Sequence, residues 1–189
     1  MVDPLAWWPG KYAECRRIAR LVDDRMPDAE ILASGGPEIF PELLEGHRVV
    51  RARIADGIDL CRLPYPDDAF DVGVSARVLE LLPPALRAAY VRELLRVCRY
   101  RLFLALPLQP ELESIDKIKN AYVWDVSRVW QYPAMQPEDL ERVLEGCGLT
   151  VTFHVEAAGP DAPAPFVIAE IVKTEAAPAM LAPASLAAH

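Results

Sequence analysis

The sequence predicts an α/β fold, in which a doubly wound, mostly parallel sheet ends in an antiparallel hairpin. Two observations predict it. Short apolar segments alternate with longer segments whose apolar residues recur every three or four positions, as strands alternate with amphipathic helices. The last two apolar segments, 150–155 and 166–173, have only a Pro-, Ala- and Gly-containing loop between them. A parallel pair needs a long crossover and a hairpin needs only a loop, so the final pair is expected to be antiparallel.

One domain accounts for residues 1–173. The chain has 189 residues, of which 52% are hydrophobic, and this suits a single α/β domain with its own core. Residues 174–189 are mostly Ala and Pro, and we expect them to form a disordered tail.

Charge, hydropathy and cysteine content argue against several classes of protein. The net charge is −8 and the basic residues are scattered, which disfavours nucleic-acid binding. No apolar run approaches the roughly 18 residues that span a bilayer, and no secretion signal opens the chain. The four cysteines form no C-x-x-C pair and only three histidines accompany them, so we expect reduced thiols and no metal site. These features favour a cytoplasmic protein.

Residues 63–82, LPYPDDAFDVGVSARVLELL, organise the middle of the chain. Two prolines hold the start of this stretch extended, and two aspartates supply turn chemistry. The apolar segment 70–75 predicts a buried strand. Pro83 and Pro84 then open a helix, because proline is tolerated in a first helical turn. We expect this helix, over 84–99, to bury one side that consists of Leu86, Tyr90, Leu94 and Val97.

The other elements follow from the same periodicities, with proline or glycine at their ends. Pro27 ends the first helix, and Gly146 is a typical residue to follow the last one. The predicted helices cover 11–26, 37–45, 84–99, 111–131 and 137–146, and the predicted strands cover 30–34, 48–53, 70–75, 101–106, 150–155 and 166–173.

The segments LPYPDDAFDVGVSARVLELLPP, VRELLRVCRY and RLFLALPL together resemble the middle of a class I S-adenosylmethionine-dependent methyltransferase. In that family an LPF-P turn precedes the fourth strand, a V-L-E-H-L segment follows it, and an arginine-rich helix leads to the fifth strand. LEGCGLTVTF resembles the approach to the sixth strand. The resemblance covers residues 30–173 and implies a Rossmann-like fold, S-adenosylmethionine as cofactor, and methyl transfer to a small molecule.

The resemblance also implies which residues bind the cofactor. Gly35 and Gly36 stand in the turn after the first strand, where the backbone approaches the ligand. Asp59, four residues before Leu-Pro, matches the acid that meets the adenine amino group. Asp56 is the candidate for the ribose hydroxyls if its loop turns back, and Ser75, at the end of the buried strand, completes the set.

The sequence departs from the family pattern at the same site. Ala33 stands in place of the acid at the end of the first strand, and Pro37 in place of a second glycine. The ribose-binding acid after the second strand is replaced by Arg53, which cannot accept a hydrogen bond. The segment from Arg53 to Asp71 is too short for the family's extra helix and third strand, so we expect a sheet that is shortened between strands 2 and 4.

Two residues are candidates for a catalytic base. The family's V-L-E-H-L segment often carries a histidine that takes a proton from the substrate, and Leu81 stands in that place here. Glu80 and Tyr122 remain as candidates. Methyl transfer needs little acid–base help once the nucleophile is aligned, so proximity and orientation would supply most of the rate. The substrate would enter under the aromatic residues Trp7, Trp8, Tyr122 and Trp124.

Three functions stay open at this point. The first is a methyltransferase that acts on a small molecule. The second is a non-catalytic methyltransferase-like scaffold, without cofactor binding, that binds a protein partner, such as a second subunit in an oligomer, or an intermediate. The shortened sheet edge, the apolar segment 111–131 and the Trp-rich ends would serve the contact. The third is a phosphorylated nucleotide as ligand of Arg53, although no G-x-G-x-x-G loop is present. Loss of three ligand hydrogen bonds, each about 0.5–1.5 kcal/mol, would weaken cofactor binding by orders of magnitude.

Overall fold

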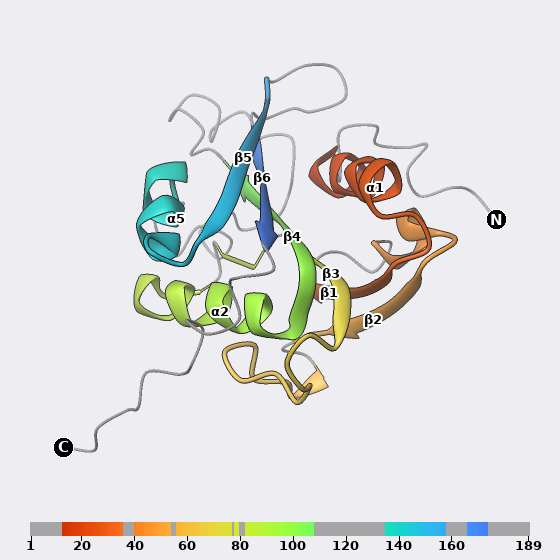
Figure 1. Cartoon of the computed structure of the whole chain (residues 1–189), viewed down its shortest axis with the longest axis horizontal. Coiled ribbons are helices and arrows are strands. Elements are labelled where there is room, and N and C mark those ends of the chain that lie inside the picture. The colour runs from red at the N-terminus through yellow and green to blue at the C-terminus, as the bar shows by residue number, and fades with distance from the viewer. Residues whose placement is uncertain are drawn as a thin grey trace, which may run out of the picture.

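The computed structural model describes residues 13–35, 40–53, 56–76, 78–79, 82–107, 135–157 and 166–173. Gly36, Glu80 and Tyr122 lie outside these residues, as do the helix expected over 111–131 and the tail 174–189. In chain order the elements are α1 (Ala13–Arg25), β1 (Glu30–Gly35), the 3₁₀ helix η1 (Pro41–Leu44), β2 (Arg48–Ala52), β3 (Phe70–Ala76), α2 (Pro84–Val97), β4 (Cys98–Pro107), α5 (Pro137–Leu144), β5 (Leu149–Glu156) and β6 (Phe166–Lys173) (Figure 1).

The six strands form one sheet in the order β2-β1-β3-β4-β6-β5. β1 is parallel to β2 and β3, and β3 is parallel to β4. β6 is antiparallel to both β4 and β5. The predicted mostly parallel sheet with a C-terminal antiparallel hairpin is therefore confirmed. The described residues between β2 and β3 form turns and no strand, so the expected shortening is present and β2 lies at one edge of the sheet.

Helices cover both faces of the sheet (Figure 1). α1 and η1 bury one set of side chains, which includes Ile18, Val22 and Leu44, against alternate residues of β1, β3 and β4. On the other face, α2 packs over the remaining residues of β3 and β4, and α5 packs against β5, with Tyr90, Leu94 and Leu140 fully buried. The buried apolar residues of α1, such as Ile18 and Val22, therefore recur at helical spacing on the side that faces the sheet.

α2 differs from its prediction in two respects. It ends at Val97 and β4 starts at Cys98, whereas the sequence favoured a helix as far as residue 99. Leu86, expected on the buried side, is 45% exposed, and Arg87 is 6% exposed instead. The Nε–H of Arg87 donates to the carbonyl oxygen of Leu82 at 3.1 Å, so the long side chain of Arg87 takes the inward position of the first turn.

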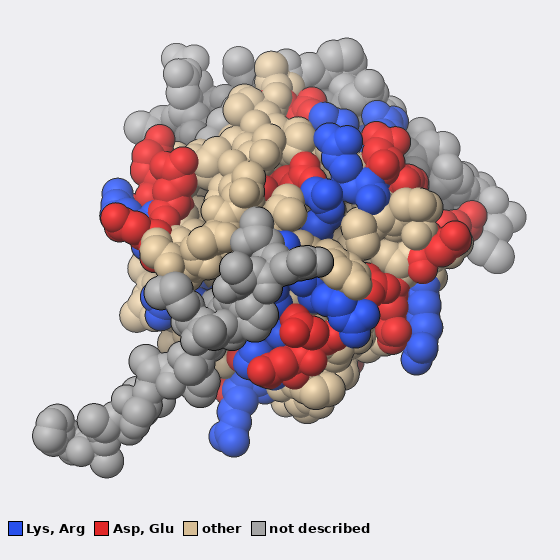
Figure 2. Space-filling model, viewed as in Figure 1, with Lys and Arg blue, Asp and Glu red and all other residues tan. Residues whose placement is uncertain are grey.

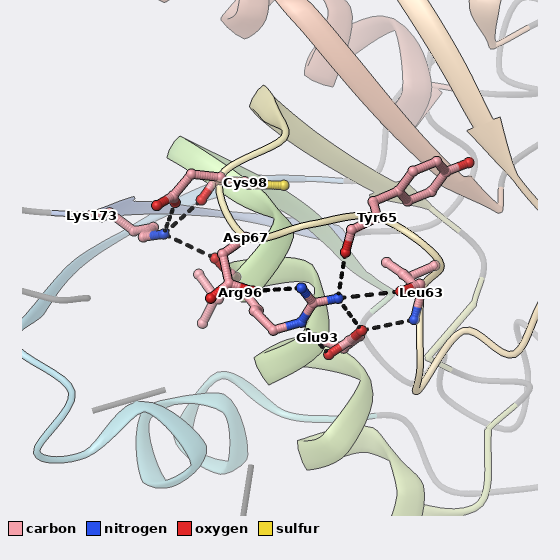
Figure 3. A network of polar contacts seen from close by, with 9 residues as sticks. Leu63, Tyr65, Asp67, Glu93, Arg96, Cys98 and Lys173 are labelled. Carbon is pink, nitrogen blue, oxygen red and sulfur yellow. Dashed lines mark hydrogen bonds and ion pairs between the residues drawn. The ribbon is translucent and has the colours of Figure 1, made fainter. Parts of the chain in front are cut away.

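The turn at 63–68 is fastened to α2 by an ion pair (Figure 3). The guanidinium of Arg96 donates hydrogen bonds to both carboxylate oxygens of Glu93, at 2.7 and 3.0 Å. Glu93 accepts a hydrogen bond from the N–H of Leu63 at 2.7 Å. Arg96 donates to the carbonyl oxygens of Leu63 and Tyr65 at 3.2 and 2.9 Å, and to the carboxylate of Asp67 at 2.6 Å. The Glu93–Arg96 pair therefore supplies the backbone hydrogen bonds that a helix or strand would otherwise supply to this turn.

Lys173, the last residue of β6, closes the same end of the molecule (Figure 3). Its ammonium group is nearly buried and donates to the carboxylate of Asp68 at 2.6 Å. It also donates to the carbonyl oxygens of Leu95 and Cys98, at 3.1 and 2.7 Å. Because these carbonyls lie at the C-terminal end of α2, Lys173 provides the positive charge that a helix C-terminus favours.

A further charged group lies on the α1 face of the sheet. The carboxylate of Glu170 is 5% exposed and contacts Arg101 of β4 and Nε2 of His154 of β5, the latter at 2.9 Å. Arg25, at the end of α1, lies 3.8 Å from it. Two guanidinium groups thus offset the cost of burying this carboxylate. On the side of the molecule drawn in Figure 2, acidic and basic side chains lie interspersed.

Candidate functional site

The carboxyl ends of β1 and β3 form the topological switch point of the sheet. The chain continues from β1 to β2 on one side, while β3 and β4 lie on the other side. In open α/β sheets, ligands bind outside the strand ends at this point. Gly35, Ala76 and Val78 are the described residues nearest to it, and Arg53 and Asp56 follow the neighbouring strand β2. The structure therefore brings two predicted cofactor residues, Gly35 and Asp56, to adjacent strand ends.

Gly35 lies where only glycine fits. Its φ of +69° belongs to the left-handed region. A Cβ atom there would lie 2.0 Å from Cγ2 of Val78 and 3.2 Å from the carbonyl oxygen of Ala76. Val78 is 3% exposed, so it has little room to move aside. The backbone at the end of β1 is thus packed directly against the segment that follows β3.

Ser75 lies at the end of β3, but its side chain turns toward α2. Its hydroxyl is 2.6 Å from the hydroxyl of Tyr90, which in turn donates to the hydroxyl of Ser34 at 2.9 Å. Ser34 and Ser75 are register partners on β1 and β3, and all three residues are at most 2% exposed. The predicted contact between Ser75 and the cofactor would therefore be made by the backbone of Ser75. The sequence placed Tyr90 on the buried side of its helix but gave no sign of this hydrogen-bonded group, because Ser34 and Tyr90 lie 56 positions apart.

Arg53 and Asp56 form a two-fold hydrogen-bonded ion pair after β2. The Arg53 Nε–H donates to one carboxylate oxygen and an Nη2–H to the other, both at 2.8 Å. The N–H of Asp56 donates to the carbonyl oxygen of Arg53 at 3.1 Å, so the loop does turn back to the strand end. The hydrogen bond from Arg53 lowers the pKa of the Asp56 carboxyl group, and the charge of Arg51 adds to this.

Asp59 is exposed and belongs to a tight turn beside α2. Its Oδ1 accepts a hydrogen bond from the N–H of Cys61 at 2.9 Å, and its carbonyl oxygen accepts one from the N–H of Arg62 at 3.0 Å. The Cys61 thiol contacts the carbonyl oxygen of Leu86 in the first turn of α2, at 3.8 Å. Burial, together with the charges of Asp59 and Glu93, raises the pKa of this thiol. The turn holds the Asp59 carboxylate at the surface near the start of α2.

These residues fit parts of an adenosyl ligand. A carboxylate can accept more hydrogen bonds than the two that Arg53 makes with Asp56, so Asp56 retains capacity for hydroxyl donors. Asp59 offers an exposed acceptor for an amino group, and Gly35 permits close backbone approach. The fit is poorer at Arg53, which brings a positive charge to a position where the family has a carboxylate. Among the residues that the structure describes, no three potential metal ligands converge.

The chain has a class I S-adenosylmethionine-dependent methyltransferase-like fold. Solved structures of such enzymes resemble it. The 1,6-didemethyltoxoflavin-N1-methyltransferase of Burkholderia thailandensis, with bound 1,6-didemethyltoxoflavin and S-adenosylhomocysteine, is 13% identical, with a TM-score of 0.64 over 89% of this chain and 81% of that one.

Two further structures show the same likeness. Magnesium protoporphyrin IX methyltransferase of Synechocystis PCC 6803, with bound S-adenosylhomocysteine, is 14% identical, with a TM-score of 0.56 over 92% of this chain and 89% of that one. A possible histamine N-methyltransferase of Thermotoga maritima is 13% identical, with a TM-score of 0.52 over 90% and 97%. No family model and no curated protein matches the sequence. In the described part of the chain, no helix is long and apolar enough to cross a membrane.

Proposed function

We propose that the protein binds S-adenosylmethionine at the switch point and transfers its methyl group to a small molecule. The observation that carries the proposal is the position of Asp56. The family's ribose-binding acid is absent from the end of β2, but the turn from Arg53 returns a carboxylate to that strand end. Arg53 fixes its orientation through two hydrogen bonds of 2.8 Å. Small-molecule methyltransferases among the structural neighbours support the proposed substrate class.

Each residue of the site has a distinct role in this proposal. Gly35 lets the backbone approach the ligand, Asp56 accepts hydrogen bonds from the ribose hydroxyls, and Asp59 accepts one from the adenine amino group. When bound, the cofactor supplies a methyl group on a positively charged sulfur. The protein then contributes mainly by aligning the acceptor with that methyl group. Glu80 and Tyr122 stay the predicted bases for acceptors that must lose a proton.

Calorimetric titration of S-adenosylmethionine and S-adenosylhomocysteine tests the proposal. We expect micromolar binding by the wild-type protein, and weaker binding by Asp56→Asn and Asp59→Asn, about tenfold each, for the loss of one charged hydrogen bond. Asp24→Asn is the control, because Asp24 is an exposed carboxylate at the far end of α1. An absence of heat at millimolar ligand, from protein whose circular dichroism shows it folded, would remove the proposal.

A second function, the non-catalytic scaffold, is favoured by the same ion pair. The charge of the Asp56 carboxylate is offset by Arg53, and Arg51 adds a second positive charge nearby. A carboxylate so compensated is a weaker acceptor for a ligand. If neither adenosyl compound binds, this is the function to pursue, with a protein as the partner. The location we propose is the cytoplasm, which the four free thiols of the described residues suit.

A further inference from the structure

Residues 59–67, which we call the strap, occupy the stretch where the sheet lacks its extra helix and strand. The strap makes contacts along α2 in order. Cys61 contacts Leu86 near the start of the helix, Leu63 contacts Glu93 further along, and the Asp67 carboxylate contacts Arg96 in the last turn. The strap and α2 therefore run in the same direction, with Asp59 at the end near the switch point and Asp67 at the opposite end.

Leu63 is the central anchor of the strap. Its N–H donates to Glu93 at 2.7 Å, and its carbonyl oxygen accepts from Arg96 at 3.2 Å, so both of its backbone polar groups are bound by one ion pair. The Leu63 side chain is 4% exposed and packs in the core on the α2 face. Glu93 and Arg96 are themselves only 15% and 21% exposed, which strengthens their hydrogen bonds relative to a surface pair.

The anchor at Leu63 restrains Asp59 across four residues. Leu60 is 3% exposed and packs in the same core, and Asp59 accepts a hydrogen bond from the N–H of Cys61. Leu60 and the turn from Asp59 to Arg62 hold the Asp59 carboxylate locally, and the anchor at Leu63 fixes where this turn lies along α2. Functional groups need placement within about 0.5 Å. The restraint therefore matters for any ligand that Asp59 binds.

We propose that Glu93 and Arg96 are positioning residues for Asp59, and that they set ligand affinity at the switch point through the strap. This rests on the proposed function, in which Asp59 accepts a hydrogen bond from the adenine amino group. The Glu93–Arg96 pair lies at a distance from the strand ends and touches no proposed ligand contact. The hydrogen bond between Arg96 and Glu93 raises the pKa of Arg96, so the guanidinium keeps its charge throughout the pH range in which the protein is folded.

The first measurement needs no ligand. Amide hydrogen exchange of Cys61, Arg62 and Leu63 is compared in wild-type protein, Arg96→Ala and Glu93→Ala. We expect these amides to exchange at least about tenfold faster in both variants, because the strap could then open without first breaking the full set of hydrogen bonds at Leu63. Amides of β1 should be unchanged. Arg99→Ala is the matched control, since Arg99 lies at the same end of the sheet and bonds Asp68 and Asp71 but not the strap. Unchanged exchange in Arg96→Ala would overturn the inference.

The second measurement is a double-mutant cycle read by titration with S-adenosylhomocysteine. We expect Arg96→Ala to weaken binding about tenfold in the wild-type background, and to have no effect in the Asp59→Asn background. Losses that multiply would mean that Arg96 acts independently of Asp59, which overturns the inference while the proposed function stands. If wild-type protein binds no adenosyl compound, the proposed function fails, and the effect on ligand affinity fails with it.

Discussion

The guanidinium of Arg53 lies against the carboxylate of Asp56, with both pairs of hydrogen-bonded atoms 2.8 Å apart. The pair stands at the end of β2, where the family resemblance places the ribose-binding acid. A basic residue at this position suggests at first that the site is lost. The geometry offers a different interpretation. Arg53 binds the carboxylate of Asp56, which lies three residues further along the chain, and the turn between them brings that carboxylate back to the strand end.

The pKa of Asp56 should depend on Arg53. The hydrogen bond from Arg53 lowers the folded-state pKa of Asp56 below its ordinary 3.8, so the pair stabilises the protein above that pH and its contribution is lost as pH falls through the folded pKa. In Arg53→Ala, a ¹³C titration of the carboxyl group should move toward the ordinary value. An unshifted Asp56 would contradict the ion pair.

Gly35→Ala should destabilise the protein by about 2–4 kcal/mol, from left-handed backbone strain and from overpacking against Val78. Gly57→Ala is the matched control, because Gly57 has a φ of +76° but no atom within 4 Å of a Cβ. It should cost only the strain, about 1–2 kcal/mol. Urea unfolding measures both. Equal losses would show that the Val78 contact is unimportant, and Val78→Ala should restore part of the stability of Gly35→Ala.

Tyr90→Phe should cost about 1–3 kcal/mol in urea unfolding, because it leaves the buried hydroxyls of Ser34 and Ser75 without their shared partner. Tyr100→Phe is the control, since Tyr100 is 46% exposed. Adding Ser34→Ala and Ser75→Ala should recover part of the loss, because no buried hydroxyl then remains in the group. A Tyr90→Phe protein as stable as wild type would rule out the bridge between α2 and the switch point.

Cys98 should make the protein less stable at alkaline pH. Burial raises the pKa of its thiol to about 12, from 9.0. A raised pKa means that the folded state holds its proton more tightly, so this contribution is complete below pH 9.0 and is lost as pH rises toward 12. The loss should be roughly a few kcal/mol. The stability difference between wild type and Cys98→Ala, measured by urea unfolding from pH 8 to 11, should therefore shrink with pH; a constant difference would contradict burial of a neutral thiol.

Local patterns in the sequence were sufficient for the order of the elements that the structure describes. Proline at 83 and 84 starts α2, Gly146 follows α5 with a φ of +76°, and the span of β6 is as predicted. The parallel-to-antiparallel change and the shortened sheet also followed from the lengths of the connections. These features depend on residues that are close in the chain and on the lengths of the connections, and both can be read directly from the sequence.

The pairing of side chains is what only the tertiary structure decided. The sequence placed Ser75 at the end of a strand, but not its hydroxyl beside Tyr90, and it placed Asp56 near Arg53 without the turn that joins them. It also put Leu86 on the buried side of α2, where Arg87 lies instead. Hydrophobic periodicity indicates which face of an element is buried, whereas hydrogen-bond partners and the exact inward residue depend on neighbours that are distant in sequence and brought together only by packing.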